Sequence, residues 1–179
     1  MVLPMHSKKD ACLERDNMQE ICFIAPQLRY FDSYWDMFDT IAQEGKYLAS
    51  KQALPKESTK LLFMYCIEEK VPFRLVLDHQ TNQIVGWCDA QMCGEGICSL
   101  GIGLLKDYRE RGIGSRLISE MFAIVRKQGY YRMELDVRSS NLRAIHVYEK
   151  LGFYTTKVKR DAFCCDGYTE DILRMECEL

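Results

Sequence analysis

The segment Arg109-Glu110-Arg111-Gly112-Ile113-Gly114-Ser115 joins a predicted strand that ends near Leu105 to a predicted helix that begins near Gly112. Closely spaced glycines let the backbone turn and approach a ligand, and the free amides at a helix N-terminus point toward an anion such as phosphate. Arg109, Arg111 and Arg116 add positive charge where it reinforces the helix dipole. These residues predict an anion-binding turn, with an ordinary Gly-rich strand-to-helix turn as the alternative.

Two common nucleotide-binding loops do not fit this glycine pattern. No Gly-Lys-Ser or Gly-Lys-Thr follows the turn, so it is not a Walker loop. The earlier pair Gly101-x-Gly103 lacks the third glycine of a dinucleotide-binding fingerprint. The turn alone therefore indicates an anion without identifying it.

The hydrophobic pattern on both sides of the turn predicts a mixed α/β fold. An amphipathic helix over 112–128 places Leu117, Ile118, Met121, Phe122 and Val125 on one face. A strand–helix–strand–helix–strand order in the second half implies a parallel crossover within the sheet. The other predicted strands are 21–29, 73–78, 83–93, 97–105, 132–137, 153–160 and 169–177, and the other predicted helices are 30–42, 55–69 and 141–151. The helix over 55–69 is predicted to bury Leu62, Phe63, Cys66 and Ile67.

Length and composition limit the class of protein. The 179 residues suffice for one domain with a core, which we place at 21–179 after a flexible N-terminal arm at 1–20. Apolar residues make up 47% and charged residues 28%, a balance typical of a globular rather than a disordered chain. The net charge of -2 argues against a nucleic-acid partner. The longest run without Asp, Glu, Lys or Arg is ten residues, so no membrane span is expected.

The nine cysteines have no spacing that indicates a metal site or a disulfide framework. Their number is odd, no Cys-x-x-Cys pair occurs, and the chain has three histidines. Residues 1–20 carry charges throughout, so they do not resemble a secretory signal. We therefore expect reduced thiols, no metal, and a cytoplasmic location.

The stretch from about Leu100 to Phe153 resembles the acetyl-CoA-binding core of the GNAT N-acetyltransferase superfamily. Arg109-x-x-Gly112-x-Gly114 matches the pyrophosphate loop of that family. The order and spacing of later segments also match, namely Glu134-Leu135-Asp136-Val137, Asn141, Ala144-Ile145 and Tyr148-Glu149-Lys150-Leu151-Gly152-Phe153. A weaker likeness, to a bacterial subgroup whose acceptors are generally unassigned, extends from about 22 to 176.

The resemblance implies a mixed, mostly antiparallel sheet with helices on both faces and a splay between its fourth and fifth strands. Acetyl-CoA would fill that opening, with its pantetheine paired to backbone and its pyrophosphate held by the amides from Arg111 through Ser115. A backbone amide near Leu104 would stabilise the developing oxyanion of the thioester. The implied cofactor-binding residues are Ile102, Gly103, Leu104, Arg109, Glu110, Arg111, Gly112, Ile113, Gly114, Ser115 and Asn141.

Two catalytic residues follow from the resemblance. Tyr148 matches the general acid that protonates the departing CoA thiolate, although helical spacing alone makes it equally a core tyrosine. Asp136 matches the catalytic carboxylate of ribosomal-protein N-terminal acetyltransferases, and the alternatives are an ion pair with Arg138 or Arg132 and a water chain as base. Asn141 follows Ser139-Ser140, where an asparagine also caps a helix.

These residues predict an N-acetyltransferase in which a primary amine attacks acetyl-CoA directly. A non-catalytic acyl-CoA-binding module is the alternative, and a covalent cysteine mechanism ranks below both because no Cys-His pair is evident. The sequence leaves the acceptor open among polyamines, amino acids, antibiotics and protein N-termini. Asp36, Asp39 and Glu44 are candidates for an acidic rim that a cationic acceptor would prefer, and dimers are common among such enzymes, so a homodimer is conceivable.

Overall fold

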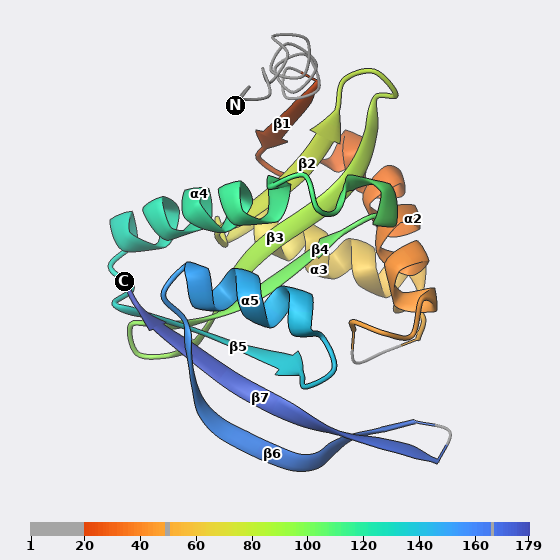
Figure 1. Cartoon of the computed structure of the whole chain (residues 1–179). Helices are drawn as coiled ribbons and strands as arrows, with labels where there is room; N and C mark the ends of the chain where they lie inside the picture. The colour runs from red at the N-terminus through yellow and green to blue at the C-terminus, as the bar shows by residue number, and fades with distance from the viewer. Residues whose placement is uncertain (1–19, 49–50, 166) are drawn as a thin grey trace, which may run out of the picture.

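The computed structural model of the chain describes residues 20–48, 51–165 and 167–179. Apart from Glu20, the predicted N-terminal arm at 1–20 lies outside the described residues. The strands of the described part form one sheet in the order β1-β2-β3-β4-β5-β7-β6 (Figure 1). Their bounds are Ile21–Ile24 (β1), Phe73–Asp78 (β2), Gln83–Gly94 (β3), Ile97–Leu104 (β4), Arg132–Arg138 (β5), Tyr154–Cys165 (β6) and Tyr168–Glu178 (β7).

The helices cover both faces of this sheet. In Figure 1, α4 (Ile113–Lys127) and α5 (Leu142–Lys150) lie in front of the strands, and α3 (Lys56–Glu68) lies behind them. Helix α2 (Phe31–Gln43) packs on the face of β3 opposite to α4, since its buried residues belong to a separate core cluster. Two short 3-10 helices, η1 (Leu28–Tyr30) and η2 (Lys106–Tyr108), precede α2 and the β4–α4 turn.

The sheet opens between β4 and β5, which confirms the predicted splay. These two strands run parallel and pair only from Ile97 with Arg132 to Ser99 with Glu134. Beyond that point β4 continues to pair with β3 as far as Leu104, and β5 continues to pair with β7 as far as Arg138. All the other strand pairs are antiparallel, so the mixed, mostly antiparallel sheet is confirmed.

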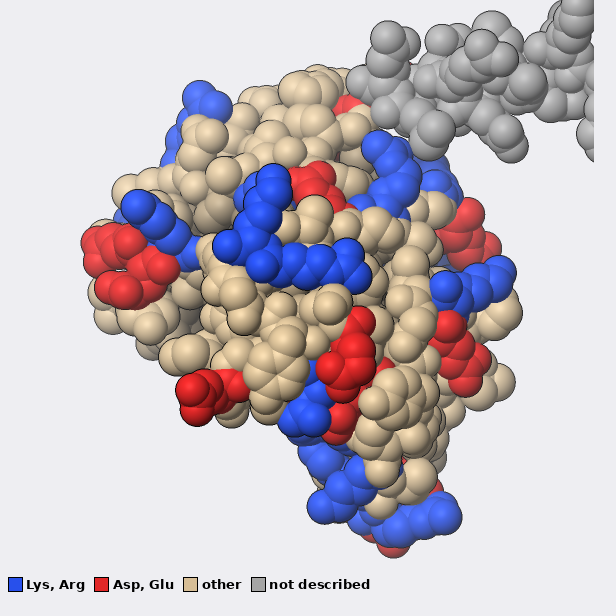
Figure 2. Space-filling view, turned by 90° about the vertical axis from the view of Figure 1, so that its left-hand side faces the viewer, with Lys and Arg blue, Asp and Glu red and all other residues tan. Residues whose placement is uncertain are grey.

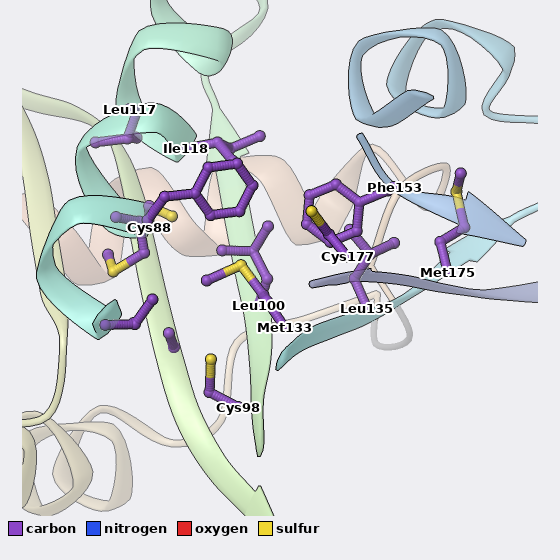
Figure 3. Packing of buried hydrophobic residues seen from close by; sticks show 14 of the residues in the cluster. Cys88, Cys98, Leu100, Leu117, Ile118, Met133, Leu135, Phe153, Met175 and Cys177 are labelled. Carbon is purple, nitrogen blue, oxygen red and sulfur yellow. The ribbon is translucent and has the colours of Figure 1, made fainter. Parts of the chain in front are cut away.

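The larger core holds the two halves of the sheet together next to the splay. It packs the buried face of α4 against β4 and β5, as Figure 3 shows for Leu117, Ile118, Leu100, Met133 and Leu135. All five apolar residues that the helical spacing assigned to this face are buried. This tightly packed layer fixes where α4 begins, and therefore where the β4–α4 turn lies.

The smaller core lies on the other face, where α2 and α3 pack on β2 and β3. Phe63 from α3 is 2% exposed there and touches the rings of Phe31, Tyr34 and Phe73. The prediction that α3 also buries Leu62 is wrong, because this side chain is 54% exposed. Helix α3 carries exposed Leu61, Leu62 and Tyr65 beside its buried face, so its apolar residues do not form the single stripe that periodicity assumes.

Charged side chains of both signs share the outer surface. Figure 2 shows Lys and Arg gathered at the centre of one face and on the lower protrusion, where β6 and β7 lie, with Asp and Glu close by in both places. No helix among the described residues is long and apolar enough to cross a membrane. The eight cysteines within the described ranges are all free thiols.

Candidate active site

A cavity of about 600 Å³ opens where β4 and β5 separate. Its walls come from the end of α2 and the loop after it, from β4, from the β4–α4 turn, from the end of β5 and from α5. The predicted site residues that line it are Ile102, Gly103, Leu104, Arg109, Glu110, Gly112, Gly114, Ser115, Asn141 and Tyr148. Arg111, Ile113 and Asp136 do not line it.

The β4–α4 turn presents free backbone amides to this cavity. Gly112 is the N-cap residue of α4, and no side chain caps the helix there. Its φ of +71° lies in the left-handed region, which glycine adopts without strain. Glu110 also has a positive φ, +64°, so two left-handed residues two positions apart curl the chain. Such a curl gathers N–H groups into an anion-binding concavity, which the dipole of α4 reinforces.

Arg109 does not offer its charge to a ligand in the way the sequence suggested. Its Nη atoms donate to both carboxylate oxygens of Glu44 at 2.8 and 2.5 Å, and its Nε donates to the Leu104 carbonyl at 2.8 Å. The guanidinium also stacks 4.7 Å from the ring centre of Tyr47. Arg109 thus ties the end of β4 to the end of α2.

The other two arginines near the turn stack on aromatic rings. The guanidinium of Arg111 lies 5.4 Å from the ring centre of Tyr108, and that of Arg116 lies 5.4 Å from the ring centre of Phe23. Ile113 is 4% exposed and belongs to the core, so only its backbone amide can serve a ligand. The anion-binding capacity of the turn therefore comes from main-chain N–H groups first.

The edge of β4 beside the splay has unpaired backbone groups. The Leu105 N–H donates to the Val85 carbonyl, so the peptide groups of Leu104 and Ile102 point away from β3 by strand alternation. The Leu104 carbonyl accepts from Arg109, which leaves the Leu104 N–H and the polar groups of Ile102 facing the opening. Between them lies Gly103, where a Cβ would come within 2.1 Å of the Trp87 ring. This edge can pair with an extended ligand as an added strand would.

Helix α5 forms the opposite wall. The Asn141 side chain accepts from the Ala144 N–H at 3.3 Å, so it caps α5 while also lining the cavity. The Tyr148 ring packs 5.7 Å from the ring of Phe153, and no described residue hydrogen-bonds its hydroxyl. Burial raises the pKa of Tyr148 well above its ordinary value, so the phenol stays protonated at neutral pH. Tyr148 therefore combines the core contact and the cavity position that the sequence left as alternatives.

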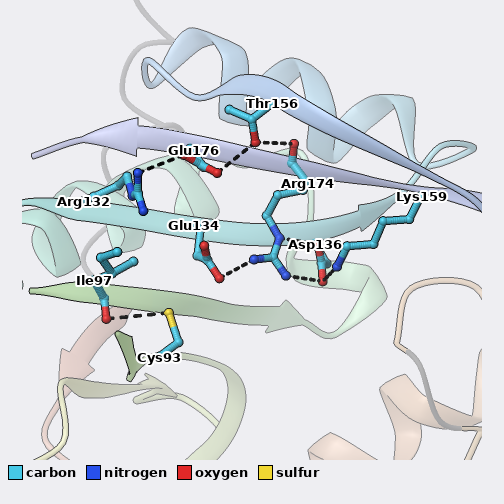
Figure 4. A network of polar contacts seen from close by, with 9 residues as sticks. All are labelled: Cys93, Ile97, Arg132, Glu134, Asp136, Thr156, Lys159, Arg174 and Glu176. Carbon is cyan, nitrogen blue, oxygen red and sulfur yellow. Dashed lines mark hydrogen bonds and ion pairs between the residues drawn. The ribbon is translucent and has the colours of Figure 1, made fainter. Parts of the chain in front are cut away.

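Asp136 belongs to a network of ion pairs (Figure 4) and does not line the cavity. Its carboxylate accepts from Arg174 at 2.6 and 2.8 Å and from Lys159 at 2.8 Å. Hydrogen bonds from Arg174, and then from Lys159, hold the pKa of Asp136 below its ordinary value. The predicted partners Arg138 and Arg132 are wrong, because these arginines pair with Glu170 and Glu176. A catalytic base at Asp136 stays a prediction, and this pairing does not favour it.

Sequence reasoning missed Arg138 as a cavity residue. It is 9% exposed, and its Nε donates to Glu170 at 2.8 Å. Burial raises the pKa of Glu170, but hydrogen bonds from Ser140 and Arg138 outweigh it and bring the pKa to about 2. No local sequence pattern predicts the pair of Arg138 and Glu170, because 32 residues separate them.

Glu110 is the one carboxylate on the cavity wall of the described chain, and it forms an ion pair with Arg143 of α5. Within residues 20–48, 51–165 and 167–179, no group of three His, Cys, Asp or Glu side chains is placed to hold a metal ion. The described groups at the cavity include backbone amides, charged side chains and the Tyr148 hydroxyl.

Residues 29–153 match the model of the acetyltransferase (GNAT) family. The chain belongs to the GNAT family. The match includes the β4–α4 turn, the splay and α5, so it covers the site described above.

Two curated relatives match the chain over part of their length. The chain is 27% identical over 96 residues to the [ribosomal protein bS18]-alanine N-acetyltransferase of Escherichia coli K12, covering 54% of this chain and 65% of that protein. It is 38% identical over 81 residues to an N-alpha-acetyltransferase of Sulfurisphaera tokodaii, covering 45% of this chain and 47% of that protein. The matches thus span less than two thirds of these relatives.

Solved GNAT structures share the whole fold. A phosphinothricin acetyltransferase of Sinorhizobium meliloti, in complex with AcCoA, aligns with a TM-score of 0.82 at 17% identity over 89% of each chain. A ribosomal-protein-alanine N-acetyltransferase of Brucella melitensis aligns with a TM-score of 0.79 at 13% identity, covering 88% of this chain and 99% of that one. At such identities the likeness shows the fold alone.

Proposed function

We propose that this GNAT chain is an acetyl-CoA-dependent N-acetyltransferase that transfers the acetyl group to a primary amine by direct attack. The observation that carries the proposal is the uncapped N-terminus of α4, which opens onto the same cavity as the unpaired edge of β4. The free amides of a helix N-terminus bind a diphosphate, and an unpaired strand edge binds an extended arm that carries amide groups. Acetyl-CoA contains both a diphosphate and such an arm, and it supplies the activated thioester.

The backbone binds most of this cosubstrate. The amides from Arg111 to Ser115 hold the diphosphate, and the edge from Ile102 to Leu104 hydrogen-bonds the pantetheine amides. Asn141 keeps its capping bond and can also donate its NH₂ group to the pantetheine from α5. Arg109 acts indirectly, because its bonds to Glu44 and to the Leu104 carbonyl fix the end of β4.

Two groups assist the chemical step. The Leu104 N–H faces the opening and donates to the thioester oxygen as negative charge develops, a contribution of about 3 kcal/mol for one such donor. The amine nitrogen forms the new C–N bond while the C–S bond breaks. The Tyr148 hydroxyl donates a hydrogen bond, and then its proton, to the departing sulfur, and solvent water carries the proton that the amine nitrogen loses back to the phenolate. Because burial raises the pKa of Tyr148, this transfer costs more than the roughly 2 kcal/mol that ordinary pKa values imply.

The acceptor amine must be unprotonated before its nitrogen can attack the thioester. The one described carboxylate on the cavity wall, Glu110, is paired with Arg143, so no unpaired carboxylate there is ready to act as base. The α-amine of a peptide N-terminus, with an ordinary pKa near 7.8, supplies its free form far more readily than a lysine side chain near 10.4. The names of the curated relatives, alanine N-acetyltransferase and N-alpha-acetyltransferase, support an α-amine as acceptor.

Thiol release from acetyl-CoA across a panel of amines, with product masses confirmed, tests this function. Wild-type protein should acetylate at least one α-amine, and Tyr148→Phe should lose most turnover while still binding acetyl-CoA. Tyr131→Phe is the matched control, since Tyr131 is exposed and does not line the cavity. Tight binding of acetyl-CoA without turnover of any amine would favour the non-catalytic binding module instead.

A further inference from the structure

Two chemically distinct groups of residues line the cavity, and they are called its two ends. At one end lie Gly112, Gly114 and Ser115 of the β4–α4 turn, the diphosphate end of the proposed function. At the other lie Lys46, Tyr47 and Leu48 of the loop after α2, together with Arg138 at the end of β5. The second end is the part of the cavity left for the acceptor.

Arg138 is a guanidinium fixed in place with a donor to spare. Its Nε donates to Glu170 at 2.8 Å and its Nη1 donates to the Gly45 carbonyl at 2.8 Å. Its guanidinium carbon lies 3.8 Å from the ring centre of Phe163. No described residue accepts a hydrogen bond from Nη2, although the residue is nine-tenths buried and lines the cavity. Three contacts therefore hold a desolvated cation whose remaining N–H groups are available to an occupant of the cavity.

The charge around this end is positive. Lys46 also lines it, and no described residue forms an ion pair with Lys46. The nearby carboxylates are committed, Glu44 to Arg109 and Glu170 to Arg138 and the Ser140 N–H. The predicted acidic rim is wrong, because Asp36, Asp39 and Glu44 do not line the cavity.

We propose that the acceptor is a small molecule that carries a carboxylate close to its primary amine, and that Arg138 and Lys46 bind this carboxylate. The inference rests on the proposed function and names its substrate class. A carboxylate gains charge-assisted hydrogen bonds from Nη2 of Arg138 and from Lys46, whereas a polyamine meets like charge. The cavity of about 600 Å³ must also admit the pantetheine arm, which leaves room for a small acceptor.

Matched sets of three amines test the substrate class. Each set contains an amino acid, its carboxamide and its decarboxylated amine, for example leucine, leucinamide and 3-methylbutylamine, and tetrapeptide amides form a separate arm. Rates at saturating acetyl-CoA are compared per concentration of unprotonated amine, because the three amines differ in pKa. For the preferred side chain, kcat/KM should be at least tenfold higher for the amino acid than for its two partners.

Variants assign the effect to the two cations. Lys46→Ala should raise KM for the amino acid about fivefold or more without changing the Kd for acetyl-CoA, and Lys46→Glu should reduce or reverse the preference for a carboxylate. Lys127→Ala is the matched control, since Lys127 is an exposed lysine in the last turn of α4 and does not line the cavity. Arg138→Lys keeps the charge beside Glu170 and should still raise KM, because an ammonium lacks the fixed planar donors.

Three results would overturn the inference. They are equal or faster acetylation of the carboxamide or decarboxylated amine, preference for tetrapeptide amides over every amino acid, and a KM unchanged by both Lys46→Ala and Arg138→Lys. Each of these leaves acetyl transfer intact. If no amine in any set is acetylated, the proposed function itself fails, so the two failures are distinguishable.

Discussion

The two ends of the cavity are built in opposite ways. The diphosphate end is one continuous turn, in which φ angles and an uncapped helix N-terminus aim main-chain amides at a ligand. The other end is assembled from three distant segments, since the Arg138 guanidinium reaches the Gly45 carbonyl 93 residues away and Glu170 32 residues away. The first end depends on local conformation, and the second depends on tertiary packing.

This difference predicts that substitutions at the two ends will have different effects. A substitution at Gly112 of the turn should weaken ligand binding while the fold persists, because a Cβ there meets no atom within 4 Å. A substitution at Arg138 should instead reduce stability, because it removes the partner of a buried carboxylate. Ligand affinity and the free energy of unfolding can therefore be perturbed separately.

The largest effect is expected for Arg138→Ala. Loss of the guanidinium leaves Glu170 buried and unpaired, which should lower the free energy of unfolding by about 3–5 kcal/mol in urea denaturation. Arg174→Ala in the more exposed network of Figure 4 is the control and should cost about 1 kcal/mol or less. Equal losses in the two variants would contradict the distinction between a buried and an exposed pair.

Acidic pH should lower the stability of the fold through Glu170, the partner of Arg138. The pKa of Glu170 falls from an ordinary 4.5 to about 2 in the folded chain, so its contribution is complete above pH 4.5 and is lost as the pH falls toward 2. The loss is on the order of 3 kcal/mol, at 1.36 kcal/mol per pKa unit. Urea denaturation between pH 6 and 2.5 should show less pH dependence in Glu170→Gln than in wild type. An identical pH dependence would show that Glu170 does not carry the effect.

Tyr148→Phe tests the proposed general acid on the α5 wall of the cavity. Removal of the hydroxyl should lower kcat about 100-fold, at the low end for general acid catalysis, and should change the Kd for acetyl-CoA less than about threefold. Steady-state kinetics and calorimetric titration separate the two quantities. A kcat within a few-fold of wild type would remove Tyr148 as the acid.

Gly112→Ala targets the turn alone. A Cβ meets nothing within 4 Å there, so its cost is the left-handed φ, about 1–2 kcal/mol, and relaxation of the turn should weaken acetyl-CoA binding about tenfold. Gly129→Ala is a close control, with φ +86° and the same open space but no place on the cavity wall. It should lose stability without losing affinity, and a similar loss of affinity in both variants would contradict a local role for the turn.

The smallest effect is expected for Asp136→Asn. Because Arg174 and Lys159 bind its carboxylate and Asp136 does not line the cavity, kcat should change less than about threefold. A pH–rate profile for the same variant should keep the acidic limb of wild type. A 100-fold loss of kcat with loss of that limb would identify Asp136 as the base.

The comparison also explains what the sequence could predict. The face of α4 and the turn at Gly112 follow from periodicity and glycine positions, which are local signals, and the splay follows from the family resemblance. The pairing of Arg109 with Glu44 and of Arg138 with Glu170 could not be predicted, because each partner lies on an element whose position depends on the packed sheet. The ion pairs of Asp136 could not be predicted for the same reason, since its partners come from β6 and β7. The residue type gives the sign of a charge, but only the assembled fold shows which opposite charge pairs with it.

A crystal structure of the chain with acetyl-CoA tests the central claim most directly. The account predicts diphosphate oxygens within hydrogen-bonding distance of the amides from Arg111 to Ser115, and the thioester oxygen beside the Leu104 N–H. A diphosphate bound anywhere else, with that turn contacting only solvent, would contradict it.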